Sequence, residues 1–154
     1  MRIVLQRVSR ARVEVGGERL AAIGAGLVAL VGIERGDDDE VAVAAADKVA
    51  GLRVFADERG RLDLNLRQAG GSVLVVPNFT LLASTARGRR PSFERAAIPE
   101  LAAQRLESFV GRLRELGISV ERGRFGAHME VVLANDGPVT LVLDFGDAGG
   151  DRPA

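Results

Sequence analysis

The sequence contains no cysteine, no tryptophan and no tyrosine, and it has a single histidine, His128. The lack of cysteine excludes disulfides, thiolate nucleophiles and cysteine-based metal sites. A metal site built on several histidines is excluded as well, so neither a metal nor another cofactor is expected. The longest apolar run, residues 27–31, is far shorter than the ~20 residues of a membrane helix. Residues 1–10 also lack the apolar stretch of a signal peptide. We therefore expect a cytoplasmic protein without a membrane partner.

An excess of charge of either sign is also absent, because 21 basic residues balance 21 acidic ones. A neutral chain is not expected to coat nucleic acid non-specifically, since that affinity comes from many phosphate contacts. DNA is therefore not an expected partner, although a local basic patch can still hold one RNA end. The length of 154 residues fits a single domain. We place this domain at residues 1–145 and expect a disordered tail at the Gly-, Asp- and Pro-rich residues 146–154.

Apolar periodicity predicts strands at both ends of the chain. A strand over residues 1–8 and an alternating stretch at 11–15 precede Gly16-Gly17, which predicts a tight hairpin into residues 18–23. Continuous apolar runs at 27–33 and 72–76 predict strands that are buried on both faces. Further strands are predicted at 120–126, 128–134 and 139–145.

Two helices are predicted between these strands. Asp37 and Glu40 match a capping box, which predicts the start of the first helix. Its apolar stripe is Val41, Ala45, Val49 and Leu52. Pro99 suits the first turn of the second helix and Gly117 its end; the stripe between them is Ala102, Leu106, Phe109, Val110 and Leu113. The order of elements predicts a mixed α/β fold, with a curved, mostly antiparallel, barrel-like sheet and two main helices.

No nucleophile elbow, P-loop or dinucleotide-binding motif is present. Acid–base catalysis by side chains is therefore poorly supported, and in an enzyme the backbone and the substrate must supply much of the chemistry. Two segments stand out. In residues 75–81 a buried strand meets a proline and two polar side chains, and residues 135–140 contain Asn-Asp-Gly-Pro. Each also has a purely structural interpretation. Residues 75–81 can be a strand end in which Thr80 bonds to local backbone, and residues 135–140 can be a plain hairpin turn.

Four stretches carry a resemblance to a known family: Gln6-Arg7-Val8, residues 68–76, residues 87–93 and residues 135–140. In this order, and spread over residues 1 to about 145, they resemble the D-aminoacyl-tRNA deacylases, also called D-Tyr-tRNA deacylases. The resemblance implies the fold of that family and a homodimeric ester hydrolase. Its substrate would be the acceptor end of tRNA that carries a D-amino acid or, as on mischarged tRNA-Ala, glycine.

The resemblance also implies how chirality is selected. In the family, the Gly-Pro peptide that matches Gly137-Pro138 is cis and reaches into the active site of the other subunit. Its two carbonyls occupy the space that an L side chain needs, whereas D-amino acids and glycine avoid the clash. Specificity would then arise by rejection of the wrong substrate.

The opposite wall of the site resembles the family's Ser-Gln-x-Thr motif at Pro77-Asn78-Phe79-Thr80. Here the chain departs from the family, because proline replaces serine and the shorter asparagine replaces glutamine. Proline has no backbone N–H, but those of Phe79 and Thr80 remain to stabilise the oxyanion of ester hydrolysis. Thr80 has no evident base that would activate it as a nucleophile. We favour attack by water with help from the 2′-hydroxyl of the terminal adenosine, and Thr80 as a positioning residue.

The remaining candidates come from other parts of the chain. Met129 resembles a pocket-side methionine of the family, and a plain core methionine is the alternative. Arg7 lies within an apolar run and needs a buried partner; the resemblance places it near the substrate and the dimer partner. The loop arginines Arg87, Arg89 and Arg90 suit tRNA phosphates, with a solvated charge cluster as the alternative.

Three rival functions stay open. One is the related deacylase that removes L-alanine from mischarged tRNA; it has a trans Gly-Pro and a Pro-Gln motif, and residues 135–140 favour the D-specific type. A second is an inactive module that binds the tRNA end, and the altered Pro77-Asn78 pair favours this reading. The third, an unrelated structural dimer, requires four ordered motifs to be coincidental.

Overall fold

A computed structural model describes residues 1–86 and 88–146 of the chain. Its elements, in chain order, are β1 (Arg2–Val15), β2 (Glu18–Ile23), β3 (Gly26–Gly32), α1 (Asp39–Gly51), β4 (Phe55–Ala56), β5 (Leu62–Leu64), β6 (Ser72–Pro77), the 3-10 helix η1 (Phe79–Leu82), α2 (Pro99–Glu115), β7 (Ser119–Arg122) and β8 (Glu130–Asp144). The predicted mixed α/β class with two main helices is confirmed. Arg87 and residues 147–154 of the predicted tail lie outside the described residues.

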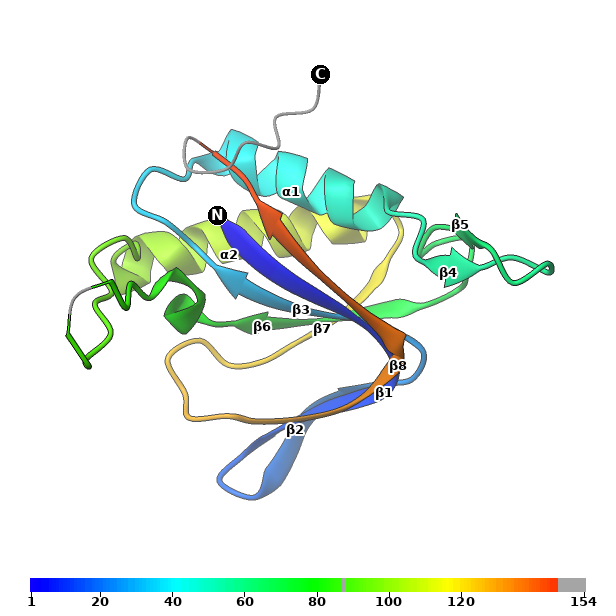
Figure 1. Cartoon of the computed structure of the whole chain (residues 1–154), viewed down its shortest axis with the longest axis horizontal. Helices are drawn as coiled ribbons and strands as arrows, with labels where there is room; N and C mark the ends of the chain where they lie inside the picture. Colours follow the sequence, from blue (N-terminus) through cyan, green and yellow to red (C-terminus); the bar gives the residue numbers. More distant parts are fainter. Residues whose placement is uncertain (87, 147–154) are drawn as a thin grey trace.

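One six-stranded sheet forms the body of the molecule, in the order β2-β1-β3-β6-β7 with β8 along the other edge of β1. Residues 2–8 of β1 pair with β3, and residues 11–15 pair with β2. β1 therefore runs along β3 and then β2 and bends between them, and β8 follows it (Figure 1). The pairs of β1 are antiparallel, whereas β3–β6 and β6–β7 are parallel. The prediction of a curved, mostly antiparallel sheet is confirmed.

The central strands β3 and β6 are buried on both faces, as their continuous apolar runs predicted. Leu27 and Val75 belong to the larger core beneath the helices, whereas Val28 and Leu74 belong to a second core on the concave side. Side chains alternate between the two faces of a strand, so one run supplies both cores. The second core is flanked by partly buried Met129 of the predicted site.

The two helices pack against each other on one face of the sheet (Figure 1). In α2 all five residues of the predicted stripe are buried, and Pro99 stands in the first turn. α1 differs from its prediction in one respect, because its N-cap is Asp38, which accepts a hydrogen bond from the Val41 N–H at 2.9 Å. Asp37 is instead buried and binds the Met1 ammonium at 2.6 Å. A buried carboxylate requires an oppositely charged partner, and because Asp37 binds the Met1 ammonium it does not cap α1.

Two predicted boundaries in the sheet were wrong. Residues 1–8 and 11–15 form one strand, because β8 pairs along nearly all of β1. The segments 128–134 and 139–145 also belong to one strand, with an irregular bulge at Asn-Asp-Gly-Pro, where a hairpin turn is the default.

Arg2 binds the end of β8 through hydrogen bonds of 2.6 and 3.0 Å to Asp144. This hydrogen bonding lowers the pKa of the Asp144 carboxyl below its ordinary value. Within the described residues, no helix is both long and apolar enough to cross a bilayer.

Candidate active site

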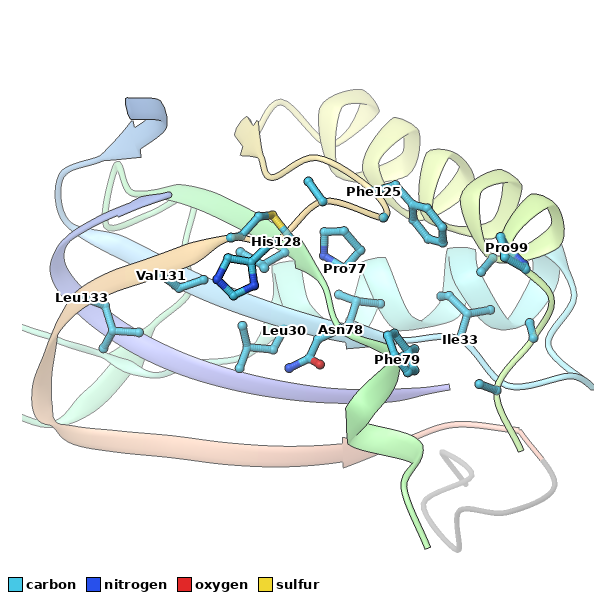
Figure 2. Close-up of a pocket in the computed structure, with 18 residues that line it drawn as sticks. Leu30, Ile33, Pro77, Asn78, Phe79, Pro99, Phe125, His128, Val131 and Leu133 are labelled. Carbon is cyan, nitrogen blue, oxygen red and sulfur yellow. The ribbon is translucent and has the colours of Figure 1, made fainter. Parts of the chain in front are cut away.

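A cavity of about 790 Å³ opens beside the carboxyl ends of β3 and β6. Residues 125–129 and the start of α2 form its other walls, and Figure 2 shows their side chains around Pro77. The lining is mostly apolar: Leu30, Val31, Ile33, Val76, Pro77, Asn78, Phe79, Ala96, Ala97, Pro99, Ala102, Phe125, Gly126, Ala127, His128, Met129, Val131 and Leu133. A mainly apolar cavity of this size with a few polar groups is typical of a small-molecule site.

Pro77 ends β6 at the floor of this cavity. The N–H of the next residue, Asn78, donates to the Val31 carbonyl of β3 at 2.8 Å. Successive N–H groups of a strand point in opposite directions, so the Pro77 nitrogen faces the side of β7. β7 ends at Arg122, opposite Val75. A proline at this position therefore removes no hydrogen bond from the sheet.

Asn78 caps the 3-10 helix η1. Its side-chain Oδ1 accepts hydrogen bonds from the Thr80 N–H, at 3.2 Å, and from the Thr80 hydroxyl. The first N–H of a helix, here that of Phe79, has no partner within the helix, and none is found for it in the parts of the chain that are described. The turn therefore presents one free backbone donor, Phe79 N–H. The expectation of a second free donor was wrong, because Asn78 occupies the Thr80 N–H.

The hydrogen bond of the Thr80 hydroxyl decides what this side chain can do. The hydroxyl donates its proton to an amide oxygen, which is not a base. A nucleophilic hydroxyl instead requires a neighbouring group that removes the proton. This geometry agrees with Thr80 as a positioning residue.

The aromatic side chain of Phe79 forms an exposed rim. It is 58% exposed and meets Phe93 edge to face, with ring centroids 5.0 Å apart. Phe93 follows a loop that is closed by two hydrogen bonds between Ser84 and Ser92, of 2.8 and 2.9 Å. The loop that carries the predicted tRNA-binding arginines is thus attached to the rim of the cavity. Arg89 and Arg90 are exposed in it, whereas Arg87 lies outside the described residues.

Met129 lines the cavity as the family resemblance implied, and the core reading also holds in part, since Met129 packs against the second core. Its sulfur accepts a hydrogen bond from the Arg124 N–H at 3.3 Å. Gly123 makes this contact possible, because a Cβ on it would lie 2.7 Å from Met129 Sδ and 3.6 Å from Pro77 Cδ.

A Gly123→Ala substitution is expected to push Met129 into the cavity. Methionine is flexible, so the free energy of unfolding should fall by only about 1 kcal/mol. The KM for the site's substrate should rise several-fold with little change in kcat. Steady-state kinetics beside thermal unfolding would check this, with Gly111→Ala, on the open face of α2, as the control. An unchanged KM would contradict the placement of Met129 in the binding site.

Gly137 and Pro138 lie in the bulge of β8, joined by a cis peptide bond. Gln6 and Val8 of β1 pair with Thr140 and Asn135, so residues 136–139 loop out opposite Arg7. The Arg7 side chain, 12% exposed, makes a 3.2 Å ion pair with Asp136 and donates to the Asp136 carbonyl at 3.2 Å. It also donates to the Val54 carbonyl at 2.6 Å. Arg7 therefore has the partners that its burial requires, and it holds the bulge in place.

Apart from the loop arginines, the predicted site residues thus form two groups. Pro77, Asn78, Phe79 and Met129 line the cavity, with Thr80 bonded to one of them. The bulge residues and Arg7 form the second group, which does not line that cavity in the described chain. Phe125 and His128 were not among the predicted site residues, yet both line the cavity (Figure 2). Their position next to Met129 was the available signal. Within the described residues no cluster of His, Asp or Glu could hold a metal ion.

Comparison with known proteins places this geometry in a family. The model of the family "D-Tyr-tRNA(Tyr) deacylase" matches residues 4–144. The chain belongs to the D-Tyr-tRNA(Tyr) deacylase family. A D-aminoacyl-tRNA deacylase of Symbiobacterium thermophilum is 56% identical over 94% of this chain and 95% of its own length. One of Cronobacter sakazakii is 51% identical over 91% and 97%. The protein is therefore an enzyme of the deacylase type, as the sequence predicted.

Solved structures agree with this placement. A structure named c-Myc DNA Unwinding Element Binding Protein is 38% identical and superposes with a TM-score of 0.88, over 94% of this chain and 98% of its own. A probable eukaryotic D-amino acid tRNA deacylase superposes with a TM-score of 0.79, over 92% and 97%. Since the latter is 16% identical, it supports the deacylase fold alone.

Proposed function

We propose that this protein hydrolyses the ester bond of D-aminoacyl-tRNA in the cytoplasm, where tRNA is charged, and releases tRNA and the D-amino acid. The observation that carries the proposal is the turn at Asn78–Thr80, which presents the free Phe79 N–H beside an open apolar cavity. A backbone donor aimed at a developing oxyanion is a common means of accelerating ester hydrolysis. The relatives, which are named D-aminoacyl-tRNA deacylases, support this ester as the substrate.

The chemistry follows from what the turn offers. Water attacks the ester carbonyl. Because no side chain on the turn is a base, the 2′-hydroxyl of the terminal adenosine takes a proton from this water and passes its own to the departing 3′-oxygen. The bond between the carbonyl carbon and that oxygen breaks, which releases the D-amino acid and the tRNA. The Phe79 N–H stabilises the oxyanion as the carbonyl becomes tetrahedral. The Asn78 side chain accepts hydrogen bonds from the Thr80 N–H and hydroxyl and so fixes the orientation of the turn.

Chirality is selected by the bulge at Gly137-Pro138, contributed by a second copy of the chain in a homodimer. Two observations support a second copy. Among the residues that the structure describes, the bulge does not line the cavity of its own chain, and β8 pairs with β1 alone, which leaves its other edge open to a partner. Val142 on β8 is 61% exposed, as a residue that meets a partner would be. The carbonyls of the bulge reject L side chains, and glycyl-tRNA is accepted because glycine has none. Arg7 fixes the bulge that performs this rejection.

The tRNA acceptor end lies along the rim formed by Phe79 and Phe93. Arg89 and Arg90, and with them Arg87, bind its phosphates from the attached loop. Guanidinium groups suit this task because they donate two parallel hydrogen bonds to phosphate oxygens.

The test is deacylation of D-Tyr-tRNA, L-Tyr-tRNA and L-Ala-tRNA by the purified protein. We expect rapid loss of the D-ester at catalytic enzyme concentrations while both L-esters persist. Hydrolysis of L-Ala-tRNA alone would move the protein to the related L-alanyl deacylases. Binding of tRNA without hydrolysis of any ester would favour the inactive binding module, which is the alternative suggested by Pro77-Asn78 in place of the family's Ser-Gln.

A further inference from the structure

A second, smaller hollow of about 310 Å³ lies on the outer face of the strands β1, β2 and β8. Three arginines line it together with small and apolar residues: Arg10, Ala11, Arg12, Arg19, Ala22, Ile23, Val132, Leu133 and Ala134. We call this set the arginine groove. Among the described residues, no carboxylate lines it.

The strand register explains why the arginines gather there. Ala11 and Val13 of β1 are buried, so Arg10 and Arg12, which alternate with them, point to the outer face. Arg10 is opposite Ala134 of β8, and Arg12 is opposite Val132. Small neighbours leave the open volume between the long arginine side chains.

The charge of the groove is only partly neutralised. Arg12 makes a 2.5 Å ion pair with Glu14. Arg10 and Arg19 form no ion pair with any carboxylate in the described part of the chain. Both are exposed, in contrast to the buried, paired Arg7. The groove therefore presents two uncompensated guanidinium groups.

The groove and the candidate active site are neighbours across β8, because Leu133 of this strand lines both. Its side chain packs against the second core, on the side of the active site, whereas the arginines lie on the outer face. Figure 2 shows Leu133 and Val131 at one end of the active-site cavity, away from Phe125 and Pro99. A polynucleotide whose terminal ester lies in the cavity would pass over the edge of β8 at Leu133 and bring its next phosphates to the arginines. Two free guanidinium groups beside an apolar floor suit a ribose-phosphate strand, since Arg binds phosphate through paired N–H donors.

We propose that Arg10 and Arg19 of the arginine groove bind backbone phosphates of the single-stranded acceptor end of tRNA. This inference rests on the proposed function. It assigns the phosphates next to the terminal adenosine to the groove, and it leaves phosphates further along the acceptor stem to the loop that carries Arg89 and Arg90.

The test compares two substrates in the full-length enzyme. D-Tyr-tRNA carries the acceptor-end phosphates, whereas D-tyrosyl-adenosine has the same ester and terminal nucleoside without a phosphate. For Arg10→Ala/Arg19→Ala, kcat/KM on D-Tyr-tRNA should fall about tenfold through KM, and the salt dependence should become shallower by roughly 0.7 for each phosphate that the variant no longer binds. The rate on D-tyrosyl-adenosine should not change. Lys48→Ala/Arg67→Ala removes two exposed charges that line neither cavity and is the matched control.

Equal losses on both substrates, or an unchanged KM for D-Tyr-tRNA, would overturn the proposal. If the wild type hydrolyses neither substrate, the proposed function fails separately, and binding of uncharged tRNA then tests the groove. Weaker tRNA binding by the double variant, with an unchanged melting temperature, supports it, and equal binding overturns it.

Discussion

Replacing Asn78 by alanine is expected to lower kcat for D-Tyr-tRNA by about a hundredfold, with a small effect on KM. The Asn78 Oδ1 holds both the N–H and the hydroxyl of Thr80, and so fixes the turn that directs the Phe79 N–H. Without this cap the turn can rotate, and a misplacement of the oxyanion donor by about 1 Å is enough for a loss of this size. Single-turnover measurement of ester hydrolysis separates this effect from binding.

Asn78→Ser is the control for this prediction. Serine also caps helices by accepting from the first free N–H groups, but it lacks the donor Nδ2 of asparagine. Recovery of most of the activity in Asn78→Ser would show that the cap matters. Equal loss in both variants would instead mean that the amide nitrogen contacts the substrate, and normal activity of Asn78→Ala would remove Asn78 from the mechanism.

Replacing Gly137 by alanine is expected to lower the ratio of D-ester to L-ester hydrolysis about tenfold. Gly137 has φ = 129°, which L residues rarely adopt. A Cβ there would lie 2.8 Å from Val139 Cγ2 and 2.9 Å from the Val139 nitrogen. The bulge must move to relieve these contacts, and it then no longer excludes an L side chain. The rates on D-Tyr-tRNA and L-Tyr-tRNA measure this directly.

Gly16→Ala controls for the loss of stability that an alanine causes at a positive φ. Gly16 also has a positive φ, of 61°, but open space surrounds its Cβ position, in the hairpin between β1 and β2. This variant should lose stability to a similar extent and keep its selectivity. An unchanged D-to-L ratio in Gly137→Ala would separate the bulge from chiral selection.

The sequence was most informative where burial alone decides the structure. The stripe of α2 and the two-faced strands β3 and β6 were predicted from periodicity because each side chain there has an apolar neighbour on the expected face. Gly16-Gly17 gave the hairpin because both need positive φ. The start of α1 was misplaced by one residue, because each of three consecutive aspartates fits an N-cap. Which of them caps the helix depends on the buried Met1 ammonium, which binds Asp37 and comes close to it only in the folded chain.

The candidate site was less predictable. Its residues were proposed from the family resemblance, but their hydrogen bonds could not be. The Asn78 cap and the engaged Thr80 N–H depend on the geometry of one turn. The course of β8 through Asn135–Pro138 also escaped prediction, because local turn propensity competes there with long-range pairing to β1. Phe125 and His128 were undervalued since a residue's type does not say which cavity it lines.

The most direct test of a chiral filter supplied by a second copy is subunit mixing. Gly137→Ala protein, which should hydrolyse L-Tyr-tRNA, is mixed with an equal amount of Asn78→Ala protein and allowed to exchange subunits. At random pairing about half of the intact pockets then face an intact bulge. We expect L-ester hydrolysis per Gly137→Ala subunit to fall to about half, while D-ester hydrolysis is retained. A rate on L-Tyr-tRNA that does not change on mixing, after exchange is verified, would contradict the account, because each bulge would then serve its own chain.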